Sequence, residues 1–383
     1  MFGDDTKYLS SSPPVRWTFV LTLLSFLSLS LLLQCGRSDS NDPSSSSSDS
    51  SQQTSSSESN TPSATVEFNR AEGFEKGPQE IKKQRTFELT DSYTIGPVES
   101  DVKQIRAWLE VPLENSQQKV EDLTVDAGDL SHKITEDPLL GNRFLYIEID
   151  DPENKTYEVV VKSRVTRSSI EGAYKEDLTE KQKQHFLRQT TEIPVNEDMR
   201  KLAQKEGASG TDLNSMRAIY DFVVNNSTYY KANPEKFSGS GEGDIDAEYC
   251  LYQKQGGCTD FHALYMSMGR SMEIPTRFVI GSFLPAEFEG KDKGVAYHCW
   301  AEAYLDGKGW LPLDAAYGDL WPDLHDYYFG QLDARRVAFS RGRGLTLVPE
   351  SNQPVSYFIK GHVEADGEKY DNWTRKLTFE EVK

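Results

Sequence analysis

The chain has 383 residues, which is long enough for two or three domains of ordinary size, and its formal net charge is −19. So acidic a protein is poorly suited to nucleic acid or to an anionic membrane surface, because affinity for phosphate groups comes mainly from Lys and Arg. Solubility in an extracytoplasmic space is the simplest explanation of the acidity. Most aromatic residues lie beyond the first sixty positions, so the rest of the chain can bury a normal core.

An uncharged apolar run, Trp17–Leu33, follows Arg16 near the N-terminus. Its composition is typical of a secretion signal, and it is short for a membrane-spanning helix, which needs ~20 apolar residues. The run ends at Leu32-Leu33-Gln34-Cys35-Gly36, which resembles a bacterial lipobox, although Gln34 stands where a small residue is usual. We expect Cys35 to be acylated as the first residue of a mature lipoprotein. An uncleaved signal anchor and simple cleavage remain alternatives, and all three export the rest of the chain.

The segment Ser38–Ser63 consists mainly of Ser, Asp, Asn and Gln. It offers too little apolar surface to offset the entropy of ordering, so a flexible tether is predicted. The full division predicted from the sequence has six parts. These are a signal with lipobox or anchor at 1–35, a Ser-rich tether at 36–80, a β-rich domain at 81–170, a linker at 171–194, a mixed helix-and-strand domain at 195–349 and a C-terminal extension at 350–383.

Between about Thr86 and Arg167 apolar and polar residues alternate, which is typical of half-buried strands. Ile105–Val111 shows this period, and Leu145–Ile149 repeats it before a turn and a returning strand at Tyr157–Val161. The pattern predicts an antiparallel β-sandwich or a small barrel, and nothing in it looks catalytic.

Beyond Pro194 the period changes to that of helices. One helix is expected at Glu197–Glu206, stopped by Gly207, a second after the N-cap residue Thr211, and a third from Gly256-Gly257-Cys258. Strands are expected at Arg277–Phe283, Val295–Leu305 and Trp310–Leu313. Helices followed by an antiparallel sheet indicate the α+β class.

Cys258 lies where a glycine pair meets a predicted helix start. Glycine allows the backbone to pass close to a substrate, and the positive end of the helix favours the thiolate over the thiol. The residue is therefore placed for nucleophilic attack. Taken alone, it could equally be a small buried apolar residue, as most free cysteines are.

His298 and Asp314 favour the catalytic interpretation. Alternation puts His298 on one face of its strand with Trp300, and Cys299 on the other. Asp306-Gly307 predicts a hairpin, and a turn centred near Asp306 brings His298 within one residue of Asp314. A carboxylate beside an imidazole fixes its tautomer and stabilises its charged form, as a base that serves a thiol requires.

Four ordered motifs resemble those of the transglutaminase-like superfamily. They are Gly256-Gly257-Cys258-Thr259-Asp260-Phe261, Ile274-Pro275-Thr276-Arg277-Phe278, Tyr297-His298-Cys299-Trp300-Ala301-Glu302 and Gly309-Trp310-Leu311-Pro312-Leu313-Asp314. The likeness covers roughly Val195–Pro349, including a trailing Arg336-Val337-Ala338-Phe339-Ser340. It implies a papain-type domain, with helices beside an antiparallel sheet, and a catalytic triad of Cys258, His298 and Asp314.

The resemblance also implies the chemistry. The thiol would attack an amide carbonyl, His298 would carry the proton, and the Cys258 amide with an upstream side chain would hold the oxyanion. Gln253 and Tyr249 are candidates for that side chain. Two residues depart from the family pattern: Glu273 replaces a common glycine and Thr276 a small alanine.

Other cysteines and histidines allow different interpretations. Cys258, His262 and His298 could be drawn as metal ligands, with Cys299 added, but the opposite face of Cys299 leaves no evident fourth ligand. A packed or hydrogen-bonded His262 is the default, and we predict no metal and no cofactor. Cys250 and Cys299 are expected either to form a disulfide or to stay as buried thiols.

The sequence thus predicts an exported, membrane-tethered lipoprotein of the bacterial cell envelope, on its periplasmic or surface side. Its substrate would be a peptide or protein amide, its membrane contact a lipid or signal anchor, and nucleic acid is excluded. No acceptor-site motif and no calcium loop of the D-x-[DN]-x-[DN]-G type is present, so hydrolysis by a peptidase or amidase is favoured over cross-linking. The alternative is a catalytically silent binding or assembly module that kept the fold.

Overall fold

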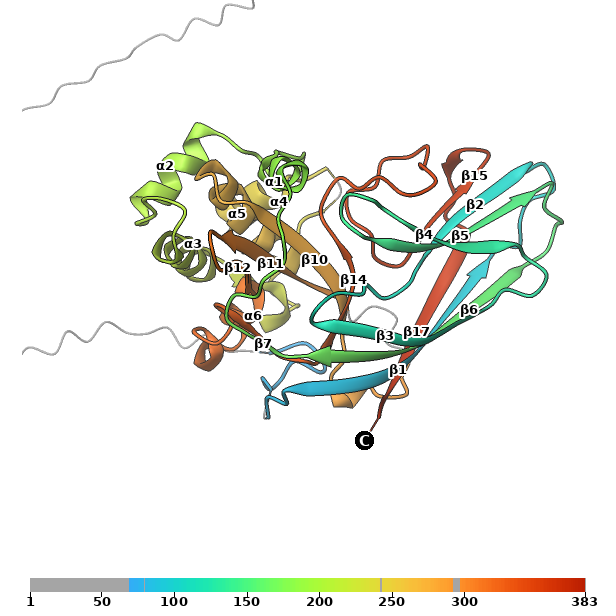
Figure 1. Cartoon of the computed structure of the whole chain (residues 1–383), viewed down its shortest axis with the longest axis horizontal. Coiled ribbons are helices and arrows are strands. Elements are labelled where there is room, and N and C mark those ends of the chain that lie inside the picture. Colours follow the sequence, from blue (N-terminus) through green and yellow to red (C-terminus); the bar gives the residue numbers. More distant parts are fainter. Residues whose placement is uncertain (1–68, 79, 242, 292–296, 383) are drawn as a thin grey trace, which may run out of the picture. The chain divides into compact units, whose positions relative to one another are not determined.

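The computed structural model describes residues 69–78, 80–241, 243–291 and 297–382 (Figure 1). Cys35, the apolar run before it and most of the predicted tether lie outside this range. Within the described segments, no helix combines the length and the apolar character needed to cross a membrane. The domain boundaries predicted from the sequence stay predictions.

Alternating apolar residues produce two antiparallel sheets in the β-rich part (Figure 1). The first has the order β17-β1-β6-β3, with bounds Trp373–Val382, Gln84–Ile95, Tyr157–Ser168 and Gln118–Asp126. The second has the order β16-β15-β2-β5-β4, with bounds Glu368–Lys369, His362–Ala365, Gln104–Glu110, Arg143–Asp150 and His132–Glu136. Strands from both ends of the described chain therefore complete these sheets.

The two sheets bury their inward faces against one another. Ile95 and Val159 of the first sheet and Ile105 and Ile147 of the second are each 0 % exposed and belong to one apolar cluster. Burial of such side chains stabilises the fold by about 1.5–3 kcal/mol each. The predicted antiparallel sandwich is confirmed.

Helices and a third antiparallel sheet make up the remainder. The sheet has the order β12-β11-β10-β14, with bounds Gly309–Leu313, Tyr297–Leu305, Thr276–Phe283 and Arg336–Arg341. The helices of the described chain are α1 (Glu180–Leu187), α2 (Glu197–Lys205), α3 (Leu213–Asn226), α4 (Asp246–Gln253), α5 (Cys258–Ser271) and α6 (Ala315–Leu320). The short pairs are β7 (Ile170–Glu171) with β13 (Gln331–Leu332), and β8 (Thr228–Tyr229) with β9 (Gln255–Gly256). The predicted α+β class is confirmed.

Helix α5 lies against the sheet and begins at Cys258, as predicted. Its first turn is capped by Asp260, whose Oδ2 accepts hydrogen bonds from the Gly257 amide at 2.6 Å and the Ser240 amide at 3.0 Å. A Cβ on Gly256 would lie 2.7 Å from the Asp260 Cβ. The first glycine of the pair therefore makes room for the capping carboxylate, whereas the sequence suggested room for substrate.

The N-cap of α3 differs by one residue from the prediction. Asp212 holds that position instead of Thr211, because its Oδ1 accepts a hydrogen bond from the Ser215 amide at 2.8 Å. Helix α2 ends at Lys205, and Gly207 follows it with a φ of +106°. That glycine stops the helix as expected, since few other residues adopt this angle.

The hairpin of β11 and β12 fixes the relation between His298 and Asp314. Leu305 pairs with Gly309 and Ala301 with Leu313, so the turn is centred on Gly307, one residue beyond the predicted centre. The register, continued by one pair, sets Asp314 opposite Trp300 and not opposite His298. Trp300 and His298 share a strand face because side chains alternate, so the predicted face is correct although the register is displaced.

The C-terminus of α5 gives a reason for the glycine that is common in the resembling motif where this chain has Glu273. The Glu273 amide bonds to the Arg270 carbonyl and the Ile274 amide to the Gly269 carbonyl, each at 2.9 Å, which is a Schellman motif. The motif requires a left-handed residue, and Glu273 has a φ of +66°. A glutamate in this conformation is strained, whereas glycine is not.

Replacing Glu273 with glycine should raise the free energy of unfolding by about 1 kcal/mol, because the left-handed conformation costs glycine nothing. The Arg200 ion pair that this change removes is 3.4 Å long and the Glu273 side chain is 75 % exposed, so its loss should matter little. Glu273→Ala is the matched control, since alanine keeps the strain and also lacks the ion pair. Denaturant unfolding measures both, and equal stabilities of the two variants would contradict this explanation.

Candidate active site

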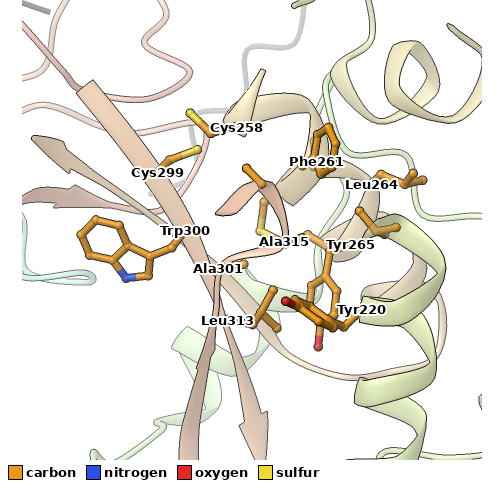
Figure 2. Close-up of a cluster of buried hydrophobic side chains, with 14 of the residues drawn as sticks. Tyr220, Cys258, Phe261, Leu264, Tyr265, Cys299, Trp300, Ala301, Leu313 and Ala315 are labelled. Atoms are coloured by element: carbon orange, nitrogen blue, oxygen red, sulfur yellow. The ribbon is translucent and has the colours of Figure 1, made fainter. Parts of the chain in front are cut away.

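Cys258 begins α5 beside strand β11, and its side chain is 3 % exposed. Its thiol lies next to that of Cys299, as Figure 2 shows, and interacts electrostatically with the His298 ring. The structure therefore brings together the cysteine and the histidine that the sequence singled out.

His298 lies at the start of β11 and is fully buried. Its Nε2 donates a hydrogen bond to Oδ2 of Asp314 at 2.7 Å. Nδ1 has no hydrogen-bond partner among the described residues, which leaves this ring nitrogen available to Cys258. The Tyr317 ring stacks on the imidazole, with centroids 3.7 Å apart and planes inclined by 6°, which holds the imidazole in one orientation.

Asp314 is the N-cap of α6 and is fully buried. Its Oδ1 accepts a hydrogen bond from the Tyr317 amide at 3.1 Å, while Oδ2 accepts from His298 and from the Arg336 guanidinium at 2.9 Å. Burial by itself would raise the pKa of this carboxyl. The charges and hydrogen bonds of His298 and Arg336 outweigh burial and lower the pKa to about 2.

Arg336 is a buried partner of the site whose role the sequence did not indicate. Its second terminal nitrogen donates to Asp333 at 2.9 Å, so the guanidinium bridges the two carboxylates Asp314 and Asp333. It also lies 5.2 Å from the Trp300 ring centre. An arginine inside an apolar strand requires a buried carboxylate as its partner. This requirement was the one feature of the sequence that could have indicated a site role for Arg336.

The electrostatics of the site favour a charged pair of Cys258 and His298. Burial opposes ionisation of the thiol, but the hydrogen bonds from Cys299 and His298 and the charges of His298 and Lys231 hold the Cys258 pKa well below its ordinary value. Burial also opposes the charge of His298, yet Asp314 and Cys258 together raise its pKa. A thiolate beside an imidazolium is the form that attacks carbonyl carbon.

Cys299 does not point away from the site, as strand alternation had indicated. Its thiol lies 3.5 Å from Nδ1 of His262 and donates toward Cys258, because α5 packs over this face of β11 at the strand's end. Trp300 extends to the opposite side, as Figure 2 shows. Cys250 and Cys299 are both free and buried, so the thiol alternative is correct and the disulfide is not.

Both ring nitrogens of His262 are used by the backbone. Nδ1 donates to the Cys258 carbonyl at 2.7 Å, and Nε2 accepts from the Ala315 amide at 3.1 Å. Burial lowers the pKa of this ring to about 4, so it is neutral. The predicted hydrogen-bonded core role is confirmed, and no group of three possible metal ligands occurs within the described segments.

The two oxyanion candidates lie on α4. The Gln253 side chain is exposed at the end of this helix, and the Tyr249 hydroxyl bonds to Ser238 and to Gln255 at 2.9 and 3.0 Å. The Cys258 amide at the start of α5 is the backbone donor that the site offers.

Comparison with known proteins decides the family of this region. Residues 200–315 match the profile of the transglutaminase-like superfamily. The chain carries a transglutaminase-like domain. Its helix-plus-antiparallel-sheet architecture is the papain-type fold that the resemblance implied.

Three relatives extend further along the chain. A protein of Haemophilus influenzae described as uncharacterized is 23 % identical over 343 residues, which cover 76 % of this chain and 91 % of that protein. A proposed cysteine protease of Cytophaga hutchinsonii is 20 % identical, covers 79 % of this chain and 99 % of its own, and has a TM-score of 0.48. The periplasmic domain of TgpA from Pseudomonas aeruginosa is 12 % identical, covers 60 % and 91 %, and has a TM-score of 0.31.

The second departure of the transglutaminase-like domain, Thr276, has a structural reason. Its Oγ1 accepts a hydrogen bond from Nε of Arg270 at 3.1 Å, and its carbonyl accepts from the same guanidinium at 2.9 Å. A Cβ on Gly269 would lie 3.1 Å from the threonine methyl. The threonine therefore anchors a buried arginine of α5 and leaves Cys258 undisturbed.

Alkylation should distinguish Cys258 from the other thiols of the folded domain. Iodoacetamide should label Cys258 through neutral pH, because its pKa is lowered, and the rate should fall only when acid protonates the thiolate. Burial raises the pKa of both Cys250 and Cys299, so these should stay unlabelled until the protein is denatured. Peptide mapping by mass spectrometry reads each site, and equal labelling of the three thiols at pH 7 would contradict the assignment.

Proposed function

We propose that this protein is a thiol acyl-transfer enzyme that acts on peptide or protein amides through Cys258, His298 and Asp314. The observation that carries the proposal is the buried row of Cys258, His298 and Asp314, in which Cys258 interacts electrostatically with the His298 ring and Nε2 of that ring donates a hydrogen bond to the Asp314 carboxylate. Its electrostatics lower the pKa of the nucleophile and raise that of the base. Strongly perturbed pKa values of this kind are concentrated at catalytic sites.

The reaction follows from the charged pair. A lone pair of the Cys258 thiolate forms the C–S bond with the amide carbonyl, and the carbonyl π electrons move to its oxygen. As the carbonyl re-forms, the C–N bond breaks and Nδ1–H of the His298 imidazolium gives its proton to the leaving amine. Neutral His298 then takes a proton from water or from an acceptor amine, which attacks the thioester and regenerates the thiolate.

Asp314 contributes orientation and charge. Because its Oδ2 holds Nε2–H of His298, the ring presents Nδ1 to the thiol and no other tautomer competes. The backbone amide of Cys258, the first residue of α5, is suited to hold the oxygen that becomes negative. These residues need no metal or cofactor for the steps described.

Hydrolysis is the branch we favour. Cross-linking needs an amine that outcompetes water for the thioester, which calls for a sheltered acceptor channel, whereas hydrolysis needs only access for water. The sequence has neither an acceptor-site motif nor a regulatory calcium loop. A peptidase or amidase is the activity that these features support best.

We also propose that the enzyme is exported and tethered to a membrane of the bacterial cell envelope. The support is the apolar run Trp17–Leu33, the lipobox-like residues that end at Cys35 and the Ser-rich stretch behind them. A long polar tether would let the domain act on envelope peptides at a distance from its anchor. Acylation of Cys35 or an uncleaved signal anchor would serve this purpose.

Purified protein incubated with a glutamine-containing peptide and excess primary amine should yield mainly the acid or cleaved peptide, as read by mass spectrometry. Cys258→Ala and His298→Ala should abolish product formation and leave folding intact. Asp314→Asn should reduce the rate by several hundredfold or more, because the amide favours the wrong tautomer and removes the charge. Cys250→Ala is the matched control and should keep full activity.

The product distribution decides between the branches of the proposal. A majority of amine adduct formed without calcium would replace hydrolysis by transfer. No Cys258-dependent product from this peptide or from a panel of cell-envelope peptides would favour a silent binding or assembly module.

Mass spectrometry of the membrane fraction should find a mature protein that begins at Cys35 and carries acyl chains. A chain that still begins at Met1 would replace lipidation by a signal anchor. A start within Ser38–Ser63 would indicate simple secretion. Cys35→Ser should abolish acylation.

A further inference from the structure

A buried lysine lies beside the proposed nucleophile and has no role in the steps above. Lys231 belongs to the 3-10 helix η1 (Tyr230–Ala232) and is 7 % exposed. Its ammonium has no hydrogen bond and no salt bridge to any described residue. Lysines are almost never buried without a partner, because desolvation of the charge is costly.

Aromatic rings hold the ammonium at the edge of the site. Nζ lies 4.0 Å from the centre of the Phe74 ring and about 6 Å from the rings of Tyr229 and Tyr230. Phe74 in turn packs edge-on against Tyr317, the residue stacked on His298. Among the described residues the cation therefore contacts ring faces and finds no acceptor for its three donor hydrogens.

The backbone brings Lys231 alongside Cys258. Strands β8 and β9 run parallel, with Tyr229 paired to Gly256. Lys231 comes two residues after Tyr229, and Cys258 comes two residues after Gly256. Lys231 consequently interacts electrostatically with Cys258, and beyond it with Cys299 and Asp314. The anion that this cation faces most directly is the thiolate.

Electrostatics agree with this geometry. Burial lowers the pKa of Lys231 to about 8, and the opposing pull of Cys258, Cys299 and Asp314 keeps it from falling further. A group with this pKa is mostly charged at neutral pH. The titratable groups that interact with Lys231 or Cys258 are Cys299, His298, His262, Asp314, Tyr229, Tyr230, Tyr297 and Tyr357.

We propose that Lys231 is a fourth catalytic residue, whose ammonium stabilises negative charge on the reacting atoms. In the resting site that charge is on the Cys258 sulfur. As the C–S bond forms, it passes to the former carbonyl oxygen, and the unused donors of Nζ are available to that oxygen as a hydrogen-bonding cation. No proton leaves Lys231 in this role. The inference rests on the proposed acyl-transfer function.

Two alkylating reagents test the charge directly. Iodoacetamide is neutral and iodoacetate is anionic, and their rates at Cys258 are compared across pH 5–9 in the full-length protein. Lys231→Met keeps the apolar stem over Phe74 and removes the charge. It should raise the midpoint of the pH profile by about one unit, slow labelling about tenfold on the acid side, and weaken the preference for iodoacetate.

Two further variants separate charge from packing. Lys231→Arg should retain most of the wild-type profile, since it restores the cation. Lys236→Met, an exposed lysine on the same segment, should change nothing. The Met variant should melt no lower than wild type, because an unpaired buried charge destabilises the fold. A wild-type pH profile in Lys231→Met, or failure of this variant to fold, would overturn the proposal.

Product formation tests the oxyanion role separately. At a pH where the thiolate is fully formed in both proteins, Lys231→Met should still turn over the glutamine-containing peptide about a hundredfold more slowly. An unchanged rate there would overturn that role. If wild type labels rapidly at Cys258 but gives no product from any peptide, the acyl-transfer function fails, while the alkylation profiles still decide whether Lys231 stabilises the thiolate.

Discussion

A carboxylate buried in an apolar interior must be compensated, and Asp314 is the residue on which the rest of this site depends. An unpaired charge of this kind would destabilise the fold by several kcal/mol. The compensation comes from three separate elements: His298 on β11, the Tyr317 amide at the start of α6, and Arg336 on β14. The same bonds that satisfy the charge therefore fix these elements relative to one another.

This constraint has chemical consequences. A carboxylate that cannot protonate near neutral pH holds the His298 ring in one tautomer and favours its charged form, which in turn favours the thiolate of Cys258. Arg336 helps to keep the carboxylate ionised by donating to Oδ2, the same oxygen that accepts from His298. Lys231 adds a positive charge on the thiol side, where its ammonium lies over the Phe74 ring. A positive side chain therefore balances negative charge at each end of the row formed by Asp314, His298 and Cys258.

Local patterns in the sequence predicted most of the fold and the three central residues of the site. Alternation found the strands of the sandwich, and the glycine pair found the start of α5 at Cys258. Even where the hairpin was centred one residue too early, the strand face of His298 was correct, because a shift of two residues keeps the face. By contrast, the prediction from alternation was wrong for Cys299. Helix α5 packs on the strand face that carries Cys299, so Cys258 at the start of this helix meets the Cys299 thiol there.

The sequence by itself determined which elements form and which residue types, in which order, make up the candidate site, because periodicity, caps and motifs act over a few neighbouring residues. Only the tertiary structure decided which charges meet. Arg336 and Lys231 lie far along the chain from Asp314 and Cys258, and nothing in their immediate neighbours reveals a partner. Electrostatic energy depends on distance and burial in the folded molecule, and both arise only when the helices and the sheet pack together.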